Sequence, residues 1–495
     1  MAEENWHQAR LIPTSGISGA EEQERRATSA LLAVMMAVRE FGRSVTGQIG
    51  APRGRIETFI EVPFMLGEQR LFPDGLIRIS RGTTMWTALV EVKTSDNPLR
   101  ADQLETYLDI AREQGFDALL TISNEIPPMP GMHPTQVDRR KLKKVALHHL
   151  SWSQIVAEAV MQKEHRGVAD PDQAWILGEL IRYLEHPRSG AMEFNDMGQS
   201  WVAIREAIAA GTLRESDRGL RDVVGRWDAL LRFTALQLGR KIGQEVTQSL
   251  ERREVGDPTL RSNVLVTEAV RSGTLSGGVR IPNSIGPIVI TADLRANRVT
   301  CSVSIAAPDS GRSATRVRWL LRQLDAAPEV LRIEAHARHA RGPGMAELLK
   351  DVRGNPEVLI ADPTRELRSF NIALSAPMGQ KRGVGRGSFI SSVQETVNVF
   401  YAQVVQNLKA WRAAAPALRE LPSESVEASP LASTALSSQD GPVESSDGQT
   451  EELPRFMTTD GLLWPPPSSA GPMSEGGTDE GTQSIARVSP AGGED

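Results

Sequence analysis

The N-terminal third of the chain alternates between patterns typical of amphipathic helices and patterns typical of strands. Residues 19–43 carry apolar side chains at helical spacing, which predicts a helix with one apolar face. Residues 55–65 place apolar side chains at every second position, as a half-buried strand does. Two further strands are expected over residues 73–80 and 85–94, joined by a tight turn at residues 81–82.

The pattern then returns to helices separated by short apolar strands. An amphipathic helix is expected to end at Gly115, because glycine readily adopts the left-handed conformation that closes a helix. Residues 116–123 and 145–150 are predicted strands, and another helix is expected over residues 151–162. The predicted order is therefore helix, three strands, helix, strand, strand and helix, which indicates an α/β unit.

The predicted elements divide the chain into four parts. Residues 1–165 form the α/β part, and residues 166–260 are expected to form a helical region that is almost wholly helical over residues 198–253. Residues 261–420 begin as a β-meander and continue with alternating helices and strands, including a helix expected over residues 344–352, as a separate α+β domain. Residues 421–495 are rich in Ser, Pro, Gly and Glu without an apolar period, so we expect a disordered tail.

Charge is distributed unevenly along the chain. The whole sequence carries 56 basic and 62 acidic side chains, a formal net charge of −6. The tail holds 13 acids and 2 bases, so the preceding 420 residues carry a net charge of +5. The tail is expected to mimic nucleic acid, to recruit a basic protein partner or to keep the protein soluble, and the α+β domain is a second candidate surface for a partner.

Cysteine content and hydropathy indicate the cellular compartment in which the protein is expected to work. The single cysteine, Cys301, excludes a disulfide framework and a Cys-rich zinc site. Neither a signal peptide nor a membrane span is expected, since no stretch approaches about 20 consecutive apolar residues. With 47 Arg against 9 Lys, the composition is typical of a GC-rich bacterial genome. We therefore expect a cytoplasmic bacterial protein, whose oligomeric state the sequence leaves open.

The tripeptide Glu91-Val92-Lys93 places two charges in an otherwise apolar strand. Residues 88–90 and Val92 are apolar, so the strand is expected to be buried on both faces. Glu91 and Lys93 then share one face of a core strand. Burying an unpaired charge costs several kcal/mol, so this pair requires a metal ion, a partner or a solvent-filled cleft.

A second carboxylate is expected beside this pair. Asp74 leads into the preceding strand, and the hairpin folds that strand back so that Asp74 and Glu91 lie near one sheet edge. Two carboxylates and the carbonyl oxygen of Val92 are oxygen ligands of the kind that Mg²⁺ prefers, with Mn²⁺ as a substitute. Lys93 is placed to polarise an attacking water and to offset negative charge that develops in a transition state.

Downstream, Gln103 and Tyr107 lie at positions i and i+4 of the next predicted helix and share one face. The succession Asp74-Gly75, Glu91-Val92-Lys93-Thr94 and Gln103-x-x-x-Tyr107 resembles the RecB-like branch of the PD-(D/E)XK nucleases, over about residues 15–155.

The resemblance implies a restriction-endonuclease-like αβββαβ fold. It also implies that Asp74 and Glu91 are metal ligands, that Lys93 is the catalytic lysine, and that Gln103 and Tyr107 position the substrate. Such families often add a glutamate from the first helix, for which Glu24 is the candidate because it shares a helix face with Leu31. The chain lacks the histidine that many RecB-like domains place near this helix.

The function expected from these residues is Mg²⁺-dependent hydrolysis of phosphodiester bonds in DNA, in repair, defence or stress response. Two alternatives stay open: a nuclease that acts on RNA, and a non-catalytic scaffold with a degenerate nuclease fold that binds nucleic acid or protein. Taken singly, Asp74 is also a common turn residue, and Glu91 with Lys93 is also compatible with an exposed pair on an edge strand.

A basic run precedes the last predicted strand of the α/β part and is a candidate for contacting a phosphate backbone. Its charged members are Arg139, Arg140, Lys141, Lys143 and Lys144. A solvated loop explains the same run. Aromatic residues make up only 5% of the chain, and no run of rings in the sequence indicates a platform for stacking single-stranded bases.

Overall fold

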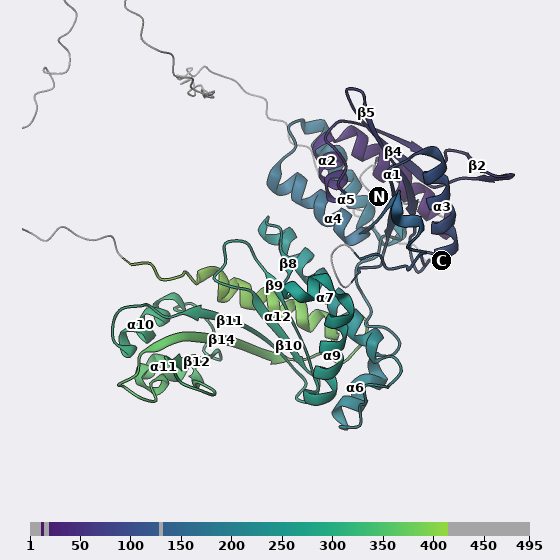
Figure 1. Cartoon of the computed structure of the whole chain (residues 1–495). Helices are drawn as coiled ribbons and strands as arrows, with labels where there is room; N and C mark the ends of the chain where they lie inside the picture. The colour runs from purple at the N-terminus through teal and green to yellow at the C-terminus, as the bar shows by residue number, and fades with distance from the viewer. Residues whose placement is uncertain (1–10, 14–18, 128–131, 414–495) are drawn as a thin grey trace, which may run out of the picture. The chain divides into compact units, whose positions relative to one another are not determined.

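The computed structural model describes residues 11–13, 19–127 and 132–413 (Figure 1). The tail predicted over residues 421–495 therefore lies outside the described residues. The described part contains three sheets: a mixed five-stranded sheet and a small two-stranded sheet in the N-terminal α/β part, and an antiparallel seven-stranded sheet in the C-terminal part. Within it, no helix has the length and apolar character needed to cross a membrane.

The five-stranded sheet has the order β1-β4-β5-β6-β7. Its strands are β1 (Arg55–Ile60), β4 (Gly75–Arg81), β5 (Thr84–Val92), β6 (Ala118–Ser123) and β7 (Ala146–Ser151). The first three pair antiparallel, whereas β5, β6 and β7 run parallel. The expected mixed α/β arrangement is confirmed.

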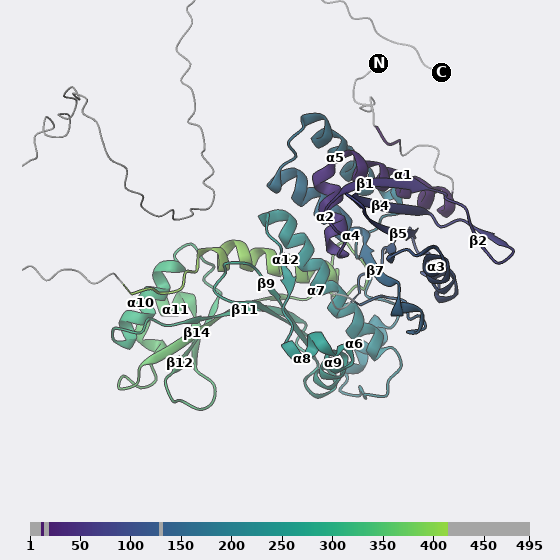
Figure 2. The same ribbon diagram turned by 45° about the horizontal axis from the view of Figure 1, so that its top comes forward.

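Helices cover both faces of this sheet (Figure 2). Four helices pack on one face through a single hydrophobic cluster: α1 (Ala20–Ala37), α2 (Arg39–Gln48), α4 (Trp152–Val160) and α5 (Pro171–Leu184). On the other face, α3 (Ala101–Gln114) forms a smaller cluster with residues such as Leu89 and Leu119. Strand β5 is consequently buried on both sides, as its apolar run predicted.

Local sequence explains where these elements end. Gly115 closes α3 in the left-handed conformation, with a φ of 69°. Ser151 caps α4 and forms a reciprocal capping box with Gln154. The strand expected over residues 55–65 is split, because Glu61 adopts a φ of 52° and Pro63 has no N–H for the sheet.

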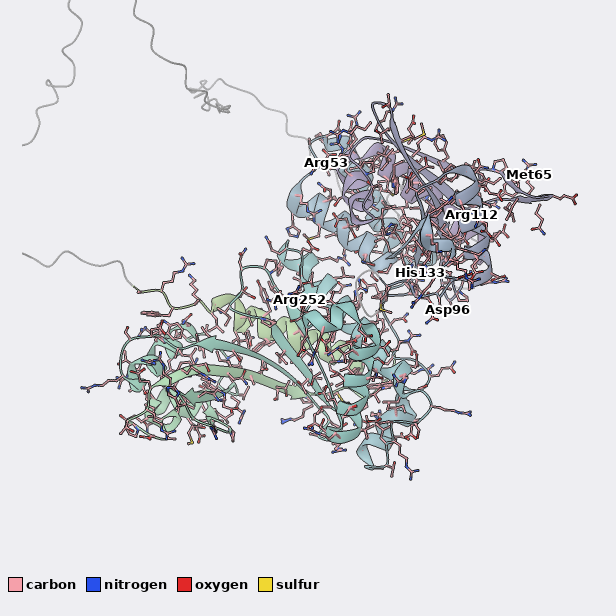
Figure 3. All side chains as sticks on the ribbon, in the orientation of Figure 1. Arg53, Met65, Asp96, Arg112, His133 and Arg252 are labelled. Carbon is pink, nitrogen blue, oxygen red and sulfur yellow. The ribbon has the colours of Figure 1, made fainter. Side chains whose placement is uncertain are left out.

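After that break the chain makes a small separate hairpin of β2 (Phe64–Leu66) and β3 (Gln69–Leu71). Its tip projects from the rest of the α/β part, and Met65 lies there with 53% of its surface exposed (Figure 3).

The region between the five-stranded and seven-stranded sheets is less helical than expected. It contains α6 (Trp201–Ala209), α7 (Leu220–Ile242), α8 (Arg252–Gly256) and α9 (Pro258–Ser272). The prediction of helix is wrong between α7 and α8, because Gly243 ends α7 with a φ of 69° and the chain then forms the short strand β8 (Thr247–Gln248). Helices α6, α7 and α9 share one hydrophobic core with the C-terminal sheet.

The seven-stranded sheet has the order β13-β12-β14-β11-β10-β9-β8. Its remaining strands are β9 (Thr274–Arg280), β10 (Ile288–Asp293), β11 (Arg298–Ala306), β12 (Arg332–Ala337), β13 (Met345–Leu348) and β14 (Leu367–Pro377), with helices α10 (Ser313–Gln323), α11 (Leu349–Gly354) and α12 (Phe389–Gln403). The prediction of a helix over residues 344–352 is wrong in its first half, which forms β13 and pairs with β12, whereas the second half lies in α11.

Short helical turns complete the described chain. They are η2 (Lys141–Lys143), η3 (Met161–Arg166), η4 (Pro187–Ser189), η5 (Pro356–Leu359) and η6 (Val405–Asn407).

Candidate active site

The hairpin of β4 and β5 brings Asp74 and Glu91 to one edge of the N-terminal sheet. Gly75, the first residue of β4, is opposite Val90 of β5. Asp74 directly precedes β4, and its Oδ2 atom accepts a hydrogen bond of 2.7 Å from the backbone N–H of Val92. Glu91 belongs to β5 and is only 1% exposed. The two carboxylates expected from the sequence are therefore neighbours in a buried environment.

Lys93 completes the group immediately beyond β5. Its Nζ atom lies 2.7 Å from Oε1 of Glu91 and 3.3 Å from Oε2 of Glu24 in α1. The second oxygen of Glu24, Oε1, accepts hydrogen bonds from Asn97 Nδ2 at 2.6 Å and from the backbone N–H of Thr94 at 3.4 Å. Glu24 thus links the first helix to the loop that follows β5.

Burial changes the proton affinity of both carboxylates. Burial, reinforced by the neighbouring charge of Asp74, raises the pKa of Glu91 to about 8, although Lys93 opposes this. Burial also raises the pKa of Asp74, against the lowering effect of the Val92 hydrogen bond. Burial alone lowers the pKa of Lys93, but the Glu91 carboxylate outweighs it and the pKa lies above its usual value.

The Glu91 carboxylate has unmet capacity to accept ligands. Both of its oxygens are buried, and no donor among the described residues gives either one a well-aligned hydrogen bond. Lys93 supplies charge at short range, as an ion pair. Two adjacent carboxylates, one of them with free lone pairs, suit a hard divalent cation such as Mg²⁺. No group of three or more His, Cys, Asp or Glu side chains arranged for a metal occurs in the described chain.

Gln103 and Tyr107 lie on α3, over the sheet face that carries Glu91. Gln103 Nε2 donates to the hydroxyl of Tyr107 over 3.2 Å, and that hydroxyl donates to the carbonyl of Phe72 over 3.5 Å. Burial, reinforced by the charge of Glu91, raises the pKa of Tyr107 to about 12, so the phenol stays protonated at neutral pH. Both side chains predicted to position the substrate are consequently next to the carboxylates.

The basic run is not part of this group. Its members lie in or next to η2, immediately before the amino end of β7. Because β7 is parallel to β6 and β6 to β5, this end belongs to the sheet edge opposite the one with Glu91 and Lys93. Lys141 is paired there with Asp109 of α3 at 2.5 Å, while Arg139, Arg140, Lys143 and Lys144 are exposed.

Two residues that support this group were missed in the sequence. Asn97 binds Glu24, the partner of Lys93, and Trp152 binds the backbone of Lys93. Asn97 follows a bend at Ser95, whose φ of 54° is unusual for a residue with a side chain. Trp152, the first residue of α4, donates its indole N–H to the carbonyl of Lys93 over 2.9 Å. An Asn-Pro pair four residues after the lysine is a turn signal that could have indicated Asn97. Trp152 gives no local signal, since it lies 59 positions from Lys93.

A separate polar network lies on the neighbouring strands β6 and β7. Thr121 of β6 is in register with Glu91, and His149 of β7 is in register with Thr121. Oγ1 of Thr121 lies 2.8 Å from Nδ1 of His149 and 2.8 Å from Nε2 of His133. Burial lowers the pKa of His149 to about 3, which keeps the ring neutral. These histidines are satisfied within the network, which anchors the segment that carries His133.

Comparisons of the chain with protein-family models, with curated proteins and with solved structures gave no match.

Proposed function

We propose that the α/β part is a Mg²⁺-dependent nuclease of the PD-(D/E)XK type with a restriction-endonuclease-like core, which hydrolyses phosphodiester bonds of DNA in the cytoplasm. One observation carries the proposal: two neighbouring carboxylates, the half-buried Asp74 and the buried Glu91, share a sheet edge with Lys93. Ionisable groups with shifted pKa values, clustered at one edge of a sheet although their burial lowers the stability of the fold, are typical of functional sites. Repair, defence and stress response are the processes that such an activity would serve.

Asp74 and Glu91 are the residues that would hold the metal. Their fit rests on the two Glu91 oxygens without well-aligned donors in the described chain and on the raised pKa of both carboxyls. A bound Mg²⁺ or Mn²⁺ would polarise a phosphodiester oxygen and lower the pKa of a bound water. The carbonyl of Val92, the third ligand expected from the sequence, remains part of the proposal.

Lys93 has the role of a fixed positive charge. Because its pKa lies above the usual value, the ammonium group is protonated at neutral pH and acts as a hydrogen-bond donor, not as a proton acceptor. It would orient the attacking water and stabilise the negative charge that develops on the phosphoryl oxygens. Glu24 and Asn97 restrict where the ammonium group can lie.

Gln103 and Tyr107 would position the substrate. Tyr107 keeps its proton at neutral pH, so its hydroxyl can donate to a phosphate oxygen in exchange for the long 3.5 Å contact with Phe72. The amide group of Gln103 has further donor and acceptor capacity beyond its bond to Tyr107. Both residues come from a rigid helix, which suits precise positioning.

Cleavage assays on the full-length protein test the proposal. Linear duplex DNA, circular duplex DNA, single-stranded DNA and RNA would each be incubated with EDTA, Mg²⁺ or Mn²⁺. We expect metal-dependent cleavage of DNA that is lost in Lys93→Ala and kept in Lys350→Ala, an exposed lysine on α11. Cleavage of RNA alone would support the ribonuclease alternative. Binding without cleavage in any metal, together with no effect of Asp74→Asn on Mg²⁺ affinity, would support the non-catalytic scaffold.

A further inference from the structure

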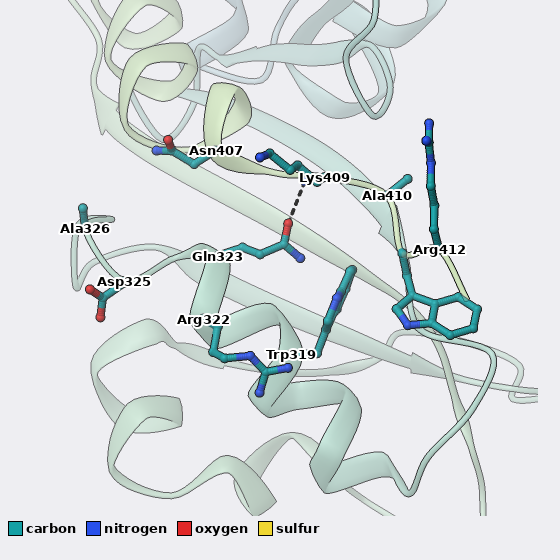
Figure 4. A pocket seen from close by; sticks show the side chains of 10 residues that line it. Trp319, Arg322, Gln323, Asp325, Ala326, Asn407, Lys409, Ala410 and Arg412 are labelled. Carbon is teal, nitrogen blue, oxygen red and sulfur yellow. Dashed lines mark hydrogen bonds between the residues drawn. The ribbon is translucent and has the colours of Figure 1, made fainter. Parts of the chain in front are cut away.

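An open groove lies in the C-terminal part, between α10 and the segment that follows η6 (Figure 4). Its volume is about 610 Å³. Trp319 of α10 and Trp411, which are 92 positions apart in the sequence, both line it. Both tryptophans are half-buried, and within the described residues neither ring packs against another aromatic ring. The fold therefore gathers two large flat rings that remain available to a ligand.

The groove is positively charged. Arg322 lines it from α10, and Lys409 and Arg412 line it from the opposite segment, against one acidic side chain, Asp325. All three cations are exposed, and none forms an ion pair with a carboxylate of the described chain. Because these three cations have no carboxylate partners in the described chain, they are available to contact a negatively charged ligand. The arrangement therefore favours an anionic ligand.

Gln323 fixes the two walls of the groove to each other. Its Oε1 atom accepts a hydrogen bond of 2.6 Å from the backbone N–H of Lys409 (Figure 4). Its Nε2 atom is buried and has no acceptor among the described residues. Trp319 also packs in part against the C-terminal core, which holds its ring in place. The groove is therefore held by a defined contact and retains an unused donor.

We propose that this groove binds a single strand of nucleic acid, with bases stacked on Trp319 and Trp411 and phosphates contacted by Arg322, Lys409 and Arg412. Base–aromatic stacking combined with backbone cations is the usual chemistry of single-strand recognition. An acidic peptide would satisfy the cations but would leave the flat faces of the rings unused. The choice of nucleic acid as ligand rests on the proposed nuclease function.

Binding would be measured by fluorescence anisotropy in EDTA, with the full chain carrying Lys93→Ala so that no strand is cut. The probes would be labelled oligo-dT, oligo-U, an abasic deoxyribose-phosphate strand of equal length, and duplex DNA. We expect oligo-dT to bind more tightly than the abasic strand. Trp411→Ala should weaken oligo-dT binding about tenfold with an unchanged melting temperature. Trp175→Ala, which removes a 55% exposed tryptophan on α5, should have no effect.

The role of the groove cations is tested by substituting them and by measuring how the binding affinity depends on salt concentration. Arg322→Glu should weaken binding and lower the salt slope, since each phosphate contact to a single strand contributes about 0.7 to that slope. Arg252→Glu, an exposed arginine on α8, is the matched control.

Equal affinity for abasic and base-bearing strands would overturn the proposal, as would wild-type affinity in Trp411→Ala or equal competition by polyglutamate. Because binding is measured without a metal, failure of cleavage with groove-dependent binding intact would refute the nuclease alone. Cleavage with no groove-dependent binding would refute this inference alone.

Discussion

Lys93 and Glu24, which are 69 positions apart in the chain, form an ion pair with Nζ and Oε2 3.3 Å apart. Both side chains are nearly buried, with 14% and 13% of their surfaces exposed. Because Glu24 belongs to α1 and Lys93 follows β5, the pair joins the first helix to the carboxyl end of the central strand. The same lysine contacts Glu91, so its ammonium group lies between two acids from different elements.

Glu24→Gln is expected to lower kcat at least about tenfold with little change in KM, because the amide keeps the shape but loses the charge that holds Lys93. Steady-state cleavage of a DNA strand measures this. Glu21→Gln provides a control one turn earlier on the same helix, where the carboxylate is 89% exposed. An unchanged kcat in Glu24→Gln would contradict the positioning role.

The raised pKa of Glu91 predicts how stability depends on pH. The folded protein holds this proton up to about pH 8, whereas an unfolded chain releases it near pH 4.5. Between these values the folded state binds more protons at Glu91, so the contribution of this residue to the free energy of unfolding of the metal-free protein should fall as pH rises. The raised pKa of Asp74 acts in the same direction. His149, whose pKa is lowered by burial to about 3, contributes in the opposite direction up to about pH 7.

Urea unfolding of the wild type and of Glu91→Gln in EDTA at pH 6, 7 and 8 would isolate this fall, because the histidines are common to both proteins. We expect the difference in unfolding free energy between the two proteins to change by on the order of 2 kcal/mol over this range. Mg²⁺ should stabilise the wild type more at pH 8 than at pH 6, because the metal replaces the proton. Parallel pH dependences of the wild type and Glu91→Gln over this range, in EDTA, would contradict the prediction and show that the buried carboxyl is already ionised at pH 6.

Trp152→Phe removes the indole donor that binds the carbonyl of Lys93 and leaves a small void, since Trp152 is 1% exposed. We expect a loss of about 1–3 kcal/mol in the free energy of unfolding. A several-fold fall in kcat should accompany it, because the backbone of Lys93 is less restricted. Trp175→Phe on α5 serves as the exposed control. A stability loss without any change in kcat would limit Trp152 to a structural role.

Arg316 of α10 is a stability determinant of the C-terminal part. It is 1% exposed and donates hydrogen bonds to the carbonyls of Leu367 at 2.6 Å and Gly311 at 3.0 Å. Arg316→Met would leave buried carbonyls without donors and should cost about 2–4 kcal/mol of unfolding free energy. Arg318→Met on the exposed side of the same helix should change stability by less than about 0.5 kcal/mol. Equal melting temperatures for the two variants would contradict this assignment.

Much of the N-terminal fold could be predicted because its signals are local. The turn between β4 and β5, which lies at Gly82-Thr83 and so one residue beyond the predicted position, and the cap at Gly115 depend on backbone conformations that glycine accepts. Alternation along β4 and β5 set which side chains share a face, so the proximity of Asp74 and Glu91 followed from the hairpin register. The errors arose where a local pattern was ambiguous, as at Met345–Leu348, which pairs as β13 although its sequence also suits a helix.

The sequence by itself determined most elements of the N-terminal part, their order, and the faces on which Glu24, Glu91 and Lys93 lie, because periodicity reports which side of an element is buried. Only the tertiary structure decided which residues of other elements pack against those faces. It brought Asn97 to Glu24 and Trp152 to Lys93, and it assembled Trp319 and Trp411 into one groove. These contacts join residues far apart in the chain, and no local propensity encodes which distant elements pack together.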